Sequence, residues 1–173
     1  MIILLSGKCG NGKDTIADYL VTNYNYSKYS FAETLKHHTS QKYNFDPVLC
    51  FTQEGKKTTI GDKTVRDLLI SEALEIRKTN DNYFVEKTVS KFQKGTDIVI
   101  SDCRYPNEIE YITKAFKDVI VLRVNKSDQQ NPTHLLPSET QLDNYQFDCI
   151  IDNDGSMESL YNSVSVFLSK TNP

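Results

Sequence analysis

A glycine-rich segment that follows an apolar run constrains this chain more than any other feature. Residues 2–5 are all apolar, and three of the seven glycines fall in the next stretch, Ser6–Thr15 (SGKCGNGKDT). A helical pattern of apolar residues comes directly after it. Strand, G-x-x-x-x-G-K loop and helix form a phosphate-binding P-loop, in which backbone N–H groups and a lysine hold the phosphates. The spacing predicts that Lys13 binds phosphate, although Asp14 stands where Ser or Thr is usual.

The composition indicates an ordinary globular chain. The 173 residues are 38% hydrophobic and 25% charged, which predicts one domain with an ample core. A net charge of −3 argues against a nucleic-acid or membrane surface. The four cysteines are scattered, so neither a structural zinc site nor a disulfide framework is indicated. No leader or membrane-spanning run is recognised, and we expect a cytoplasmic protein.

Five strand candidates alternate with helical patterns along the chain. They lie at residues 2–5, 27–31, 97–101, 119–124 and 147–151. Several are nearly continuous apolar runs, as expected for parallel strands that are covered on both faces. The sequence therefore predicts an α/β fold in three layers, α/β/α, with a five-stranded parallel sheet. Ligands of such a sheet bind at the carboxyl ends of its strands.

The connection between the second and third strands is too long for a simple crossover. Residues 32–96 contain three helical patterns. They are expected to form an insertion that either binds a second substrate or packs as helices without a ligand role. The patterns lie at 32–43, 64–78 and 81–92, with Thr64 and Asp81 as N-caps. A second polar segment, 125–146, is either a lid or a long loop. The whole chain, 1–173, is predicted to be a single domain.

Charged residues after the strands are candidates for phosphate and metal binding, because phosphoryl transfer depends on positioning and charge neutralisation. Asp102 follows the third strand, where it either binds Mg²⁺, directly or through water, or serves as a turn or cap residue. Arg104 comes two residues later. Asp14 would bind Mg²⁺ through water, orient a substrate or favour the helix N-terminus, while Thr15 offers a hydroxyl to phosphate or Mg²⁺. Lys36 either reaches an acceptor phosphate or is a solvated lysine.

Two neighbouring aromatic residues also have two readings. Tyr83 and Phe84 are expected to pack in the core, or one of them stacks on a nucleotide base. The histidines His37 and His38 are expected at the surface.

Several motifs together resemble the phage and viral deoxynucleoside monophosphate kinases, a branch of the P-loop nucleoside monophosphate kinases. The resemblance covers nearly the whole chain. Its most specific parts are R-[FY]-P-N-E at Arg104–Glu108 and the NDGS turn at Asn153–Ser156. The other matching segments are SGKCGNGKDT, FAETLK (Phe31–Lys36), VRDLL (Val65–Leu69), NDNYFVEK (Asn80–Lys87), HLLPSE (His134–Glu139) and FDCIIDNDGSMESL (Phe147–Leu160).

The resemblance implies a kinase that uses ATP and Mg²⁺ to phosphorylate deoxynucleoside monophosphates, with small molecules as its substrates. It leaves a homodimer open and implies a cytoplasmic location, in the host if the source is viral. The implied ATP-binding residues are Gly7, Gly10, Asn11, Gly12, Lys13, Asp14, Thr15, Arg123 and Asn153. The implied acceptor-binding residues are Lys8, Leu35, Lys36, Arg66, Phe84 and Glu108. Catalysis is expected from Lys13, Asp102 and Arg104, and the candidates for Mg²⁺, directly or through water, are Asp14, Thr15 and Asp102.

Two alternative functions stay open at this stage. Phosphomevalonate kinases of the animal type share a similar loop, an L-K pair after the second strand and an SE-x-x-LDN-like segment, here Ser138–Asn144. The RYPNE motif favours the nucleotide kinase. A nucleotide-binding regulator or ATPase without an acceptor is the other alternative, and the helical insertion with Lys36 and Arg66 argues against it.

Overall fold

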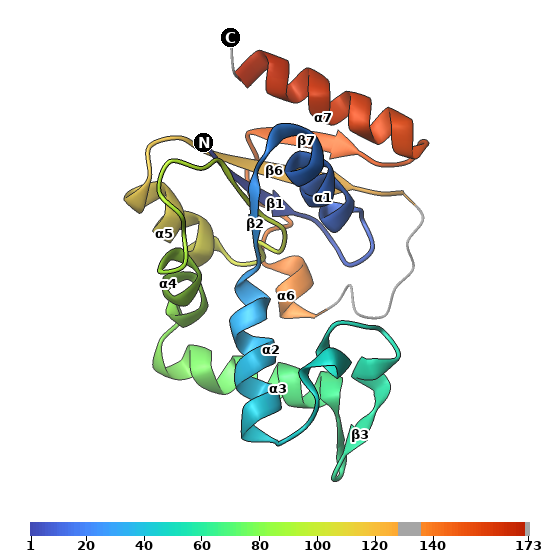
Figure 1. The fold of residues 1–173 in the computed structure, drawn as a ribbon, viewed down its shortest axis with the longest axis vertical. Helices are drawn as coiled ribbons and strands as arrows, with labels where there is room; N and C mark the ends of the chain where they lie inside the picture. The colour runs from blue at the N-terminus through green and yellow to red at the C-terminus, as the bar shows by residue number, and fades with distance from the viewer. Residues whose placement is uncertain (128–135, 172–173) are drawn as a thin grey trace. The chain divides into compact units, whose positions relative to one another are not determined.

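The computed structural model describes residues 1–127 and 136–171, and the chain separates into two compact units. Unit 1 comprises Met1–Tyr29 and Gln93–Pro173, and unit 2 comprises Ser30–Phe92 (Figure 1). Across the described residues, no helix is long and apolar enough to cross a membrane.

A five-stranded parallel sheet forms the centre of unit 1 and confirms the predicted fold class. Its order is β2-β5-β1-β6-β7, and every neighbouring pair is parallel. The strands are β1 (Ile2–Ser6), β2 (Ser27–Tyr29), β5 (Ile98–Ile100), β6 (Val119–Asn125) and β7 (Cys149–Asp152). The central strand β1 lies between β5 and β6, and its last residue, Ser6, pairs with Arg123. The third predicted strand therefore ends beside the P-loop strand, as expected.

Helices cover both faces of this sheet. The helices of unit 1 are α1 (Lys13–Tyr24), α5 (Pro106–Ala115), α6 (Pro137–Thr140) and α7 (Met157–Thr171). One core joins sheet residues such as Leu5 to Leu20 of α1 and Leu160 of α7. The β1–α1–β2 and β5–α5–β6 connections run toward opposite edges, so right-handed crossovers place α1 and α5 on opposite faces. On its own face, α5 buries Ile109 and Ile112, which completes the three layers (Figure 1).

Unit 2 contains the three predicted helices and a short hairpin. Its elements are α2 (Phe31–Lys42), the 3-10 turns η1 (Pro47–Cys50) and η2 (Gly55–Lys57), β3 (Thr59–Ile60), β4 (Lys63–Thr64), α3 (Val65–Thr79) and α4 (Tyr83–Val89). Thr64 caps α3 as predicted: its hydroxyl accepts from the Asp67 N–H at 3.1 Å, and the Asp67 carboxylate accepts from the Thr64 N–H at 3.2 Å. The Asp81 cap was wrong, because the residue before α4 is Asn82, and its side chain makes no cap bond.

Several element bounds differ from the predicted ones. Strand β2 ends at Tyr29, because β5 offers it only three residues to pair with, and Phe31 already begins α2. In the segment 125–146, the structure describes the ends and the short helix α6. Residues 128–135 of this predicted lid or long loop, which include His134, lie outside the described residues.

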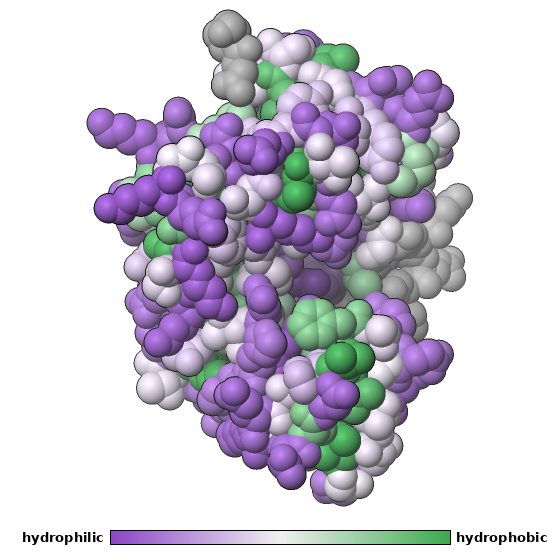
Figure 2. Space-filling model, viewed as in Figure 1, coloured by the Kyte–Doolittle hydropathy of each residue, from purple (hydrophilic) through white to green (hydrophobic). Residues whose placement is uncertain are grey.

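Most of the face seen in Figure 2 is hydrophilic, and the hydrophobic residues on it form small separate groups. Large apolar side chains that are exposed in unit 2 include Val48, Phe51 and Leu74, and those in unit 1 include Ile150, Met157 and Val166.

Candidate active site

The loop between β1 and α1 follows a backbone path that requires glycine at both its ends. Gly7 has φ +147° and Gly12, the N-cap of α1, has φ +96°. A Cβ on Gly7 would lie 2.5 Å from the carbonyl oxygen of Val124, and one on Gly12 would lie 2.5 Å from Nδ2 of Asn153. These close approaches and positive φ angles explain why the sequence has glycine at these points.

Lys13 is the first residue of α1, and its side chain returns to the loop. Its Nζ donates to the carbonyl oxygens of Gly7 at 2.6 Å and Lys8 at 2.9 Å, and the residue is 7% exposed. Burial and the nearby Arg104 lower the pKa of Lys13, whereas Glu139 acts in the opposite direction. The ammonium group thus lies within the loop, where P-loop lysines bind phosphate.

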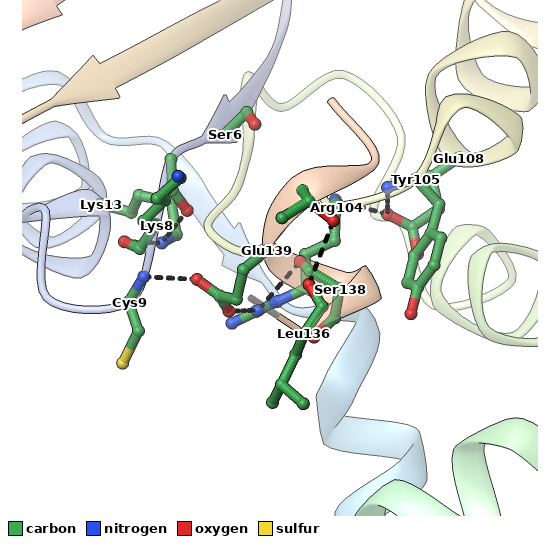
Figure 3. A network of polar contacts seen from close by, with 12 residues as sticks. Ser6, Lys8, Cys9, Lys13, Arg104, Tyr105, Glu108, Leu136, Ser138 and Glu139 are labelled. Carbon is green, nitrogen blue, oxygen red and sulfur yellow. Dashed lines mark hydrogen bonds and ion pairs between the residues drawn. The ribbon is translucent and has the colours of Figure 1, made fainter. Parts of the chain in front are cut away.

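Arg104 and Glu139 form an ion pair beside this loop (Figure 3). Arg104 follows β5, and its Nη1 donates to Oε1 of Glu139 and to the carbonyl oxygen of Ser138. The other carboxylate oxygen of Glu139 accepts from the N–H of Cys9, in the loop, at 2.6 Å. Burial opposes the charge of Arg104, but the Glu139 carboxylate raises its pKa. Sequence reasoning assigned Glu139 no role, although it belongs to the HLLPSE match and to the SE-x-x-LDN-like segment.

Glu108 fixes the backbone that carries Arg104. It is buried, and its Oε2 accepts from the N–H of Arg104 at 2.8 Å and from that of Tyr105 at 3.1 Å, which completes a capping box at α5. The N–H of Cys103 bonds to the carbonyl oxygen of Leu5 at 3.1 Å, so the turn is also attached to β1. The predicted contact of Glu108 with the acceptor stays a prediction.

Arg123 lies on β6, where it pairs with Ser6, the last residue of β1 before the loop. Its Nη1 donates to the Ser6 hydroxyl at 3.2 Å, and its Nη2 bonds to Asp143 at 2.9 Å. Lys8 approaches the other oxygen of Asp143 at 3.5 Å, and the Arg123 guanidinium lies 5.4 Å from the centroid of the Phe147 ring. The structure therefore shows the buried Arg123 in an ion pair with the more exposed Asp143, and its contact with ATP stays a prediction.

Two asparagines attach the loop to the neighbouring strands. Asn153, after β7, donates from Nδ2 to the carbonyl oxygen of Asn11 at 3.0 Å, and its N–H bonds to Asn125 at 2.8 Å. Asn11 in turn donates from Nδ2 to the carbonyl oxygen of Val124 at 2.9 Å. In the part of the chain that is described, the buried Oδ1 of Asn11 has no hydrogen-bond partner.

The three residues predicted to bind magnesium lie in two places, Asp14 and Thr15 at the start of α1 and Asp102 after β5. Asp14 is exposed on α1 and pairs with Lys28 at 2.9 Å; burial raises its pKa, but Lys28 outweighs this and the pKa is lowered. Thr15 is half-buried on the same helix. Asp102 is half-buried after β5 and acts electrostatically on Lys13.

Among residues 1–127 and 136–171, no group of three or more His, Cys, Asp or Glu residues could hold a metal ion. Mg²⁺ in kinases is held by one or two carboxylates, substrate phosphates and water rather than by an all-protein cage. Asp102, close enough to the loop lysine to act on its pKa, fits that kind of donor set.

Two of the predicted acceptor-binding residues are half-buried cations of unit 2. Lys36 of α2 has its Nζ 4.3 Å from the centroid of the Phe51 ring. Arg66 of α3 donates from Nη2 to Oε1 of Gln53 at 2.8 Å. Each cation is thus held by a neighbour in its own unit.

Phe84 belongs to the core of unit 2. It is 3% exposed, meets Tyr83 edge to face at 5.4 Å between ring centroids, and has the Arg77 guanidinium 5.2 Å from its ring. Core packing, one of the two readings of this residue, is confirmed, and a contact with an acceptor base stays a prediction. Leu35 is half-buried on α2.

A buried carboxylate that sequence reasoning missed connects α3 to α2. Glu72 is 4% exposed, and its oxygens accept from Nζ of Lys42 at 2.9 and 2.8 Å. Nε2 of His38 lies 3.0 Å from Oε1 of Glu72, and the Tyr43 hydroxyl lies 3.4 Å from Oε2. Burial raises the pKa of Glu72, but the bonds from Lys42 and His38 outweigh this and lower it.

Two comparisons of the sequence with known proteins point to the same family. A sequence profile described as deoxynucleotide monophosphate kinase matches residues 67–164. A protein of Acanthamoeba polyphaga mimivirus that is assigned the name deoxynucleotide monophosphate kinase is 26% identical over 184 aligned positions, which cover 95% of this chain and 93% of that protein.

Solved structures of other P-loop kinases share the fold. Dephospho-CoA kinase from Campylobacter jejuni superposes with a TM-score of 0.53 at 10% identity, over 98% of this chain and 96% of that one. Shikimate kinase from Acinetobacter baumannii, solved in complex with shikimate, gives 0.51 at 14% identity, over 99% and 95%. These similarities extend over nearly the whole of each chain.

Proposed function

Because this chain belongs to the deoxynucleotide monophosphate kinase family, we propose that it transfers the γ-phosphoryl group of ATP to a deoxynucleoside monophosphate. The products are ADP and the deoxynucleoside diphosphate. The observation that carries the proposal is the position of Lys13 within a glycine loop whose Cys9 N–H already binds an anionic group, the Glu139 carboxylate.

The donor side uses residues of unit 1. The loop N–H groups and the N-terminus of α1 hold the ATP phosphates, and Lys13 neutralises the β- and γ-phosphoryl oxygens. Arg104 binds the phosphoryl group during transfer through its planar guanidinium, which can grip two oxygens at once. Mg²⁺, when bound, supplies further neutralisation of the phosphates, and Asp102, with Asp14 or Thr15, would hold it directly or through water.

The acceptor side uses residues of unit 2. Lys36 and Arg66 bind the phosphate of the deoxynucleoside monophosphate, because they are half-buried cations held in place by Phe51 and Gln53. No strong general base is required, since the attacking phosphate oxygen is already anionic. The protein's task is then to align donor and acceptor and to neutralise charge.

A panel of acceptors tests this function. The protein with ATP and Mg²⁺ is incubated with each deoxynucleoside monophosphate, each ribonucleoside monophosphate, phosphomevalonate or no acceptor, and nucleotides are separated by chromatography. We expect at least one deoxynucleoside monophosphate to give its diphosphate and to raise ADP formation above the rate without acceptor. ADP formation that no acceptor raises would indicate an ATPase, and turnover of phosphomevalonate alone would indicate the other kinase.

A further inference from the structure

One carboxylate binds the groups of this loop that are suited to phosphate. Figure 3 shows Glu139 between the loop and Arg104, with one oxygen on each side. Oε2 accepts from the Cys9 N–H at 2.6 Å, and Oε1 pairs with the Arg104 guanidinium. Glu139 is 7% exposed, so this contact is shielded from water.

Carboxylates and phosphates compete for the same donors. Backbone N–H groups of a P-loop and arginine guanidinium groups bind both anions, and the bonds are charge-assisted in each case. A phosphoryl group that takes the Cys9 N–H and the Arg104 guanidinium must replace Glu139 there. If Glu139 stayed, its negative charge would lie beside the phosphate oxygens and repel them.

The fold allows Glu139 to leave without releasing the segment that carries it. Four residues later, Asp143 is attached to Arg123 at 2.9 Å and to Lys8 at 3.5 Å. In both pairs, Asp143 contacts the charged end of a side chain. The segment therefore has a second attachment to the rest of unit 1, besides the bonds of Glu139.

We infer that Glu139 is a positioning residue that takes the place of a phosphate in the nucleotide-free enzyme. It holds the Arg104 guanidinium beside the loop and yields both donors to the nucleotide phosphates when these bind. The inference rests on the proposed function only in that the loop binds ATP, and it adds a residue and an exchange step to that binding.

Calorimetric binding of MgATP without any acceptor tests the exchange. Glu139→Gln keeps the shape of the side chain but removes its charge, so the phosphates no longer displace an anion. We expect the Kd of the variant for MgATP to fall by about tenfold, the scale of one charge-assisted hydrogen bond. Glu139→Asp keeps the charge but shortens the reach, and its Kd should fall as well. A merely structural role for Glu139 predicts weaker binding instead.

The matched control is Glu110→Gln, which changes the net charge by the same amount. Glu110 is exposed on α5, and its carboxylate lies 3.6 Å from Nζ of Lys114. Its Kd should equal that of the wild type. The Cys9 amide resonance gives a readout without nucleotide, and it should shift in Glu139→Gln and not in Glu110→Gln. An unchanged or higher Kd in both Glu139 variants overturns the inference. Failure of every deoxynucleoside monophosphate to react would instead overturn the proposed function, because these binding measurements involve no acceptor.

Discussion

Replacing Gly12 with alanine should destabilise the protein through two separable effects. Alanine at φ +96° costs about 1–2 kcal/mol, because its Cβ approaches the neighbouring carbonyl oxygen. The new Cβ would also lie 2.5 Å from Nδ2 of Asn153, which must move and give up its bond to the Asn11 carbonyl oxygen. Loss of that bond adds about 1 kcal/mol. We therefore expect Gly12→Ala to lower the free energy of unfolding by about 2–3 kcal/mol.

Urea unfolding followed by circular dichroism measures this, with Gly95→Ala as the control. Gly95 has φ +78° in an exposed turn, and a Cβ there meets nothing within 4 Å, so its cost is that of the backbone alone, about 1–2 kcal/mol. In an Asn153→Ala background the clash at Gly12 is absent, and Gly12→Ala should cost no more than Gly95→Ala. The double-mutant cycle then gives a coupling of about 1 kcal/mol. Equal costs at the two glycines and no coupling would refute the reasoning.

Three further predictions concern the acceptor, the transferred group and pH. Lys36→Ala and Arg66→Ala should each raise KM for the monophosphate about tenfold and leave KM for ATP unchanged; equal effects on both substrates would show that these residues do not bind the acceptor. Arg104→Lys should lower kcat about tenfold or more with little change in melting temperature, because lysine lacks the planar fork; normal kcat with a lower melting temperature would assign it a structural role. Glu72 has a lowered pKa in the fold, so its stabilising effect is present above its ordinary value of 4.5 and is lost as pH falls below it. In Glu72→Gln, the free energy of unfolding should therefore fall less steeply as pH is lowered into the acid range. Glu75→Gln, which removes an exposed ion pair, should show the same dependence on pH as the wild type.

The sheet and its P-loop were predictable because local patterns determine them. The apolar run at residues 2–5 and the glycines after it identify a buried strand and a phosphate loop without reference to the rest of the chain. The capping box at Thr64 is equally local, since its two partners are three residues apart. Asp81 failed as a cap because Asn82, next to it, stands immediately before α4, and propensity alone does not separate such neighbours.

The ion pairs of the site were not predictable, because they join residues far apart in sequence. Glu139 meets Cys9 across 130 positions and Arg104 across 35. Glu72 is similar: nothing near it in the sequence distinguishes a buried carboxylate with a lysine and a histidine from an exposed glutamate on a helix. For the same reason, the sequence pointed to Arg123 without revealing its partner Asp143.

Transfer of label from γ-labelled ATP tests the central claim most directly. The wild-type protein and Lys13→Ala are each given labelled ATP, Mg²⁺ and the best deoxynucleoside monophosphate, and the products are separated. We predict that the label appears in the β-phosphate of the deoxynucleoside diphosphate. We also predict that a folded Lys13→Ala variant has a kcat lower by at least about a hundredfold. Label found only in inorganic phosphate, or near-normal transfer by the variant, would contradict the account.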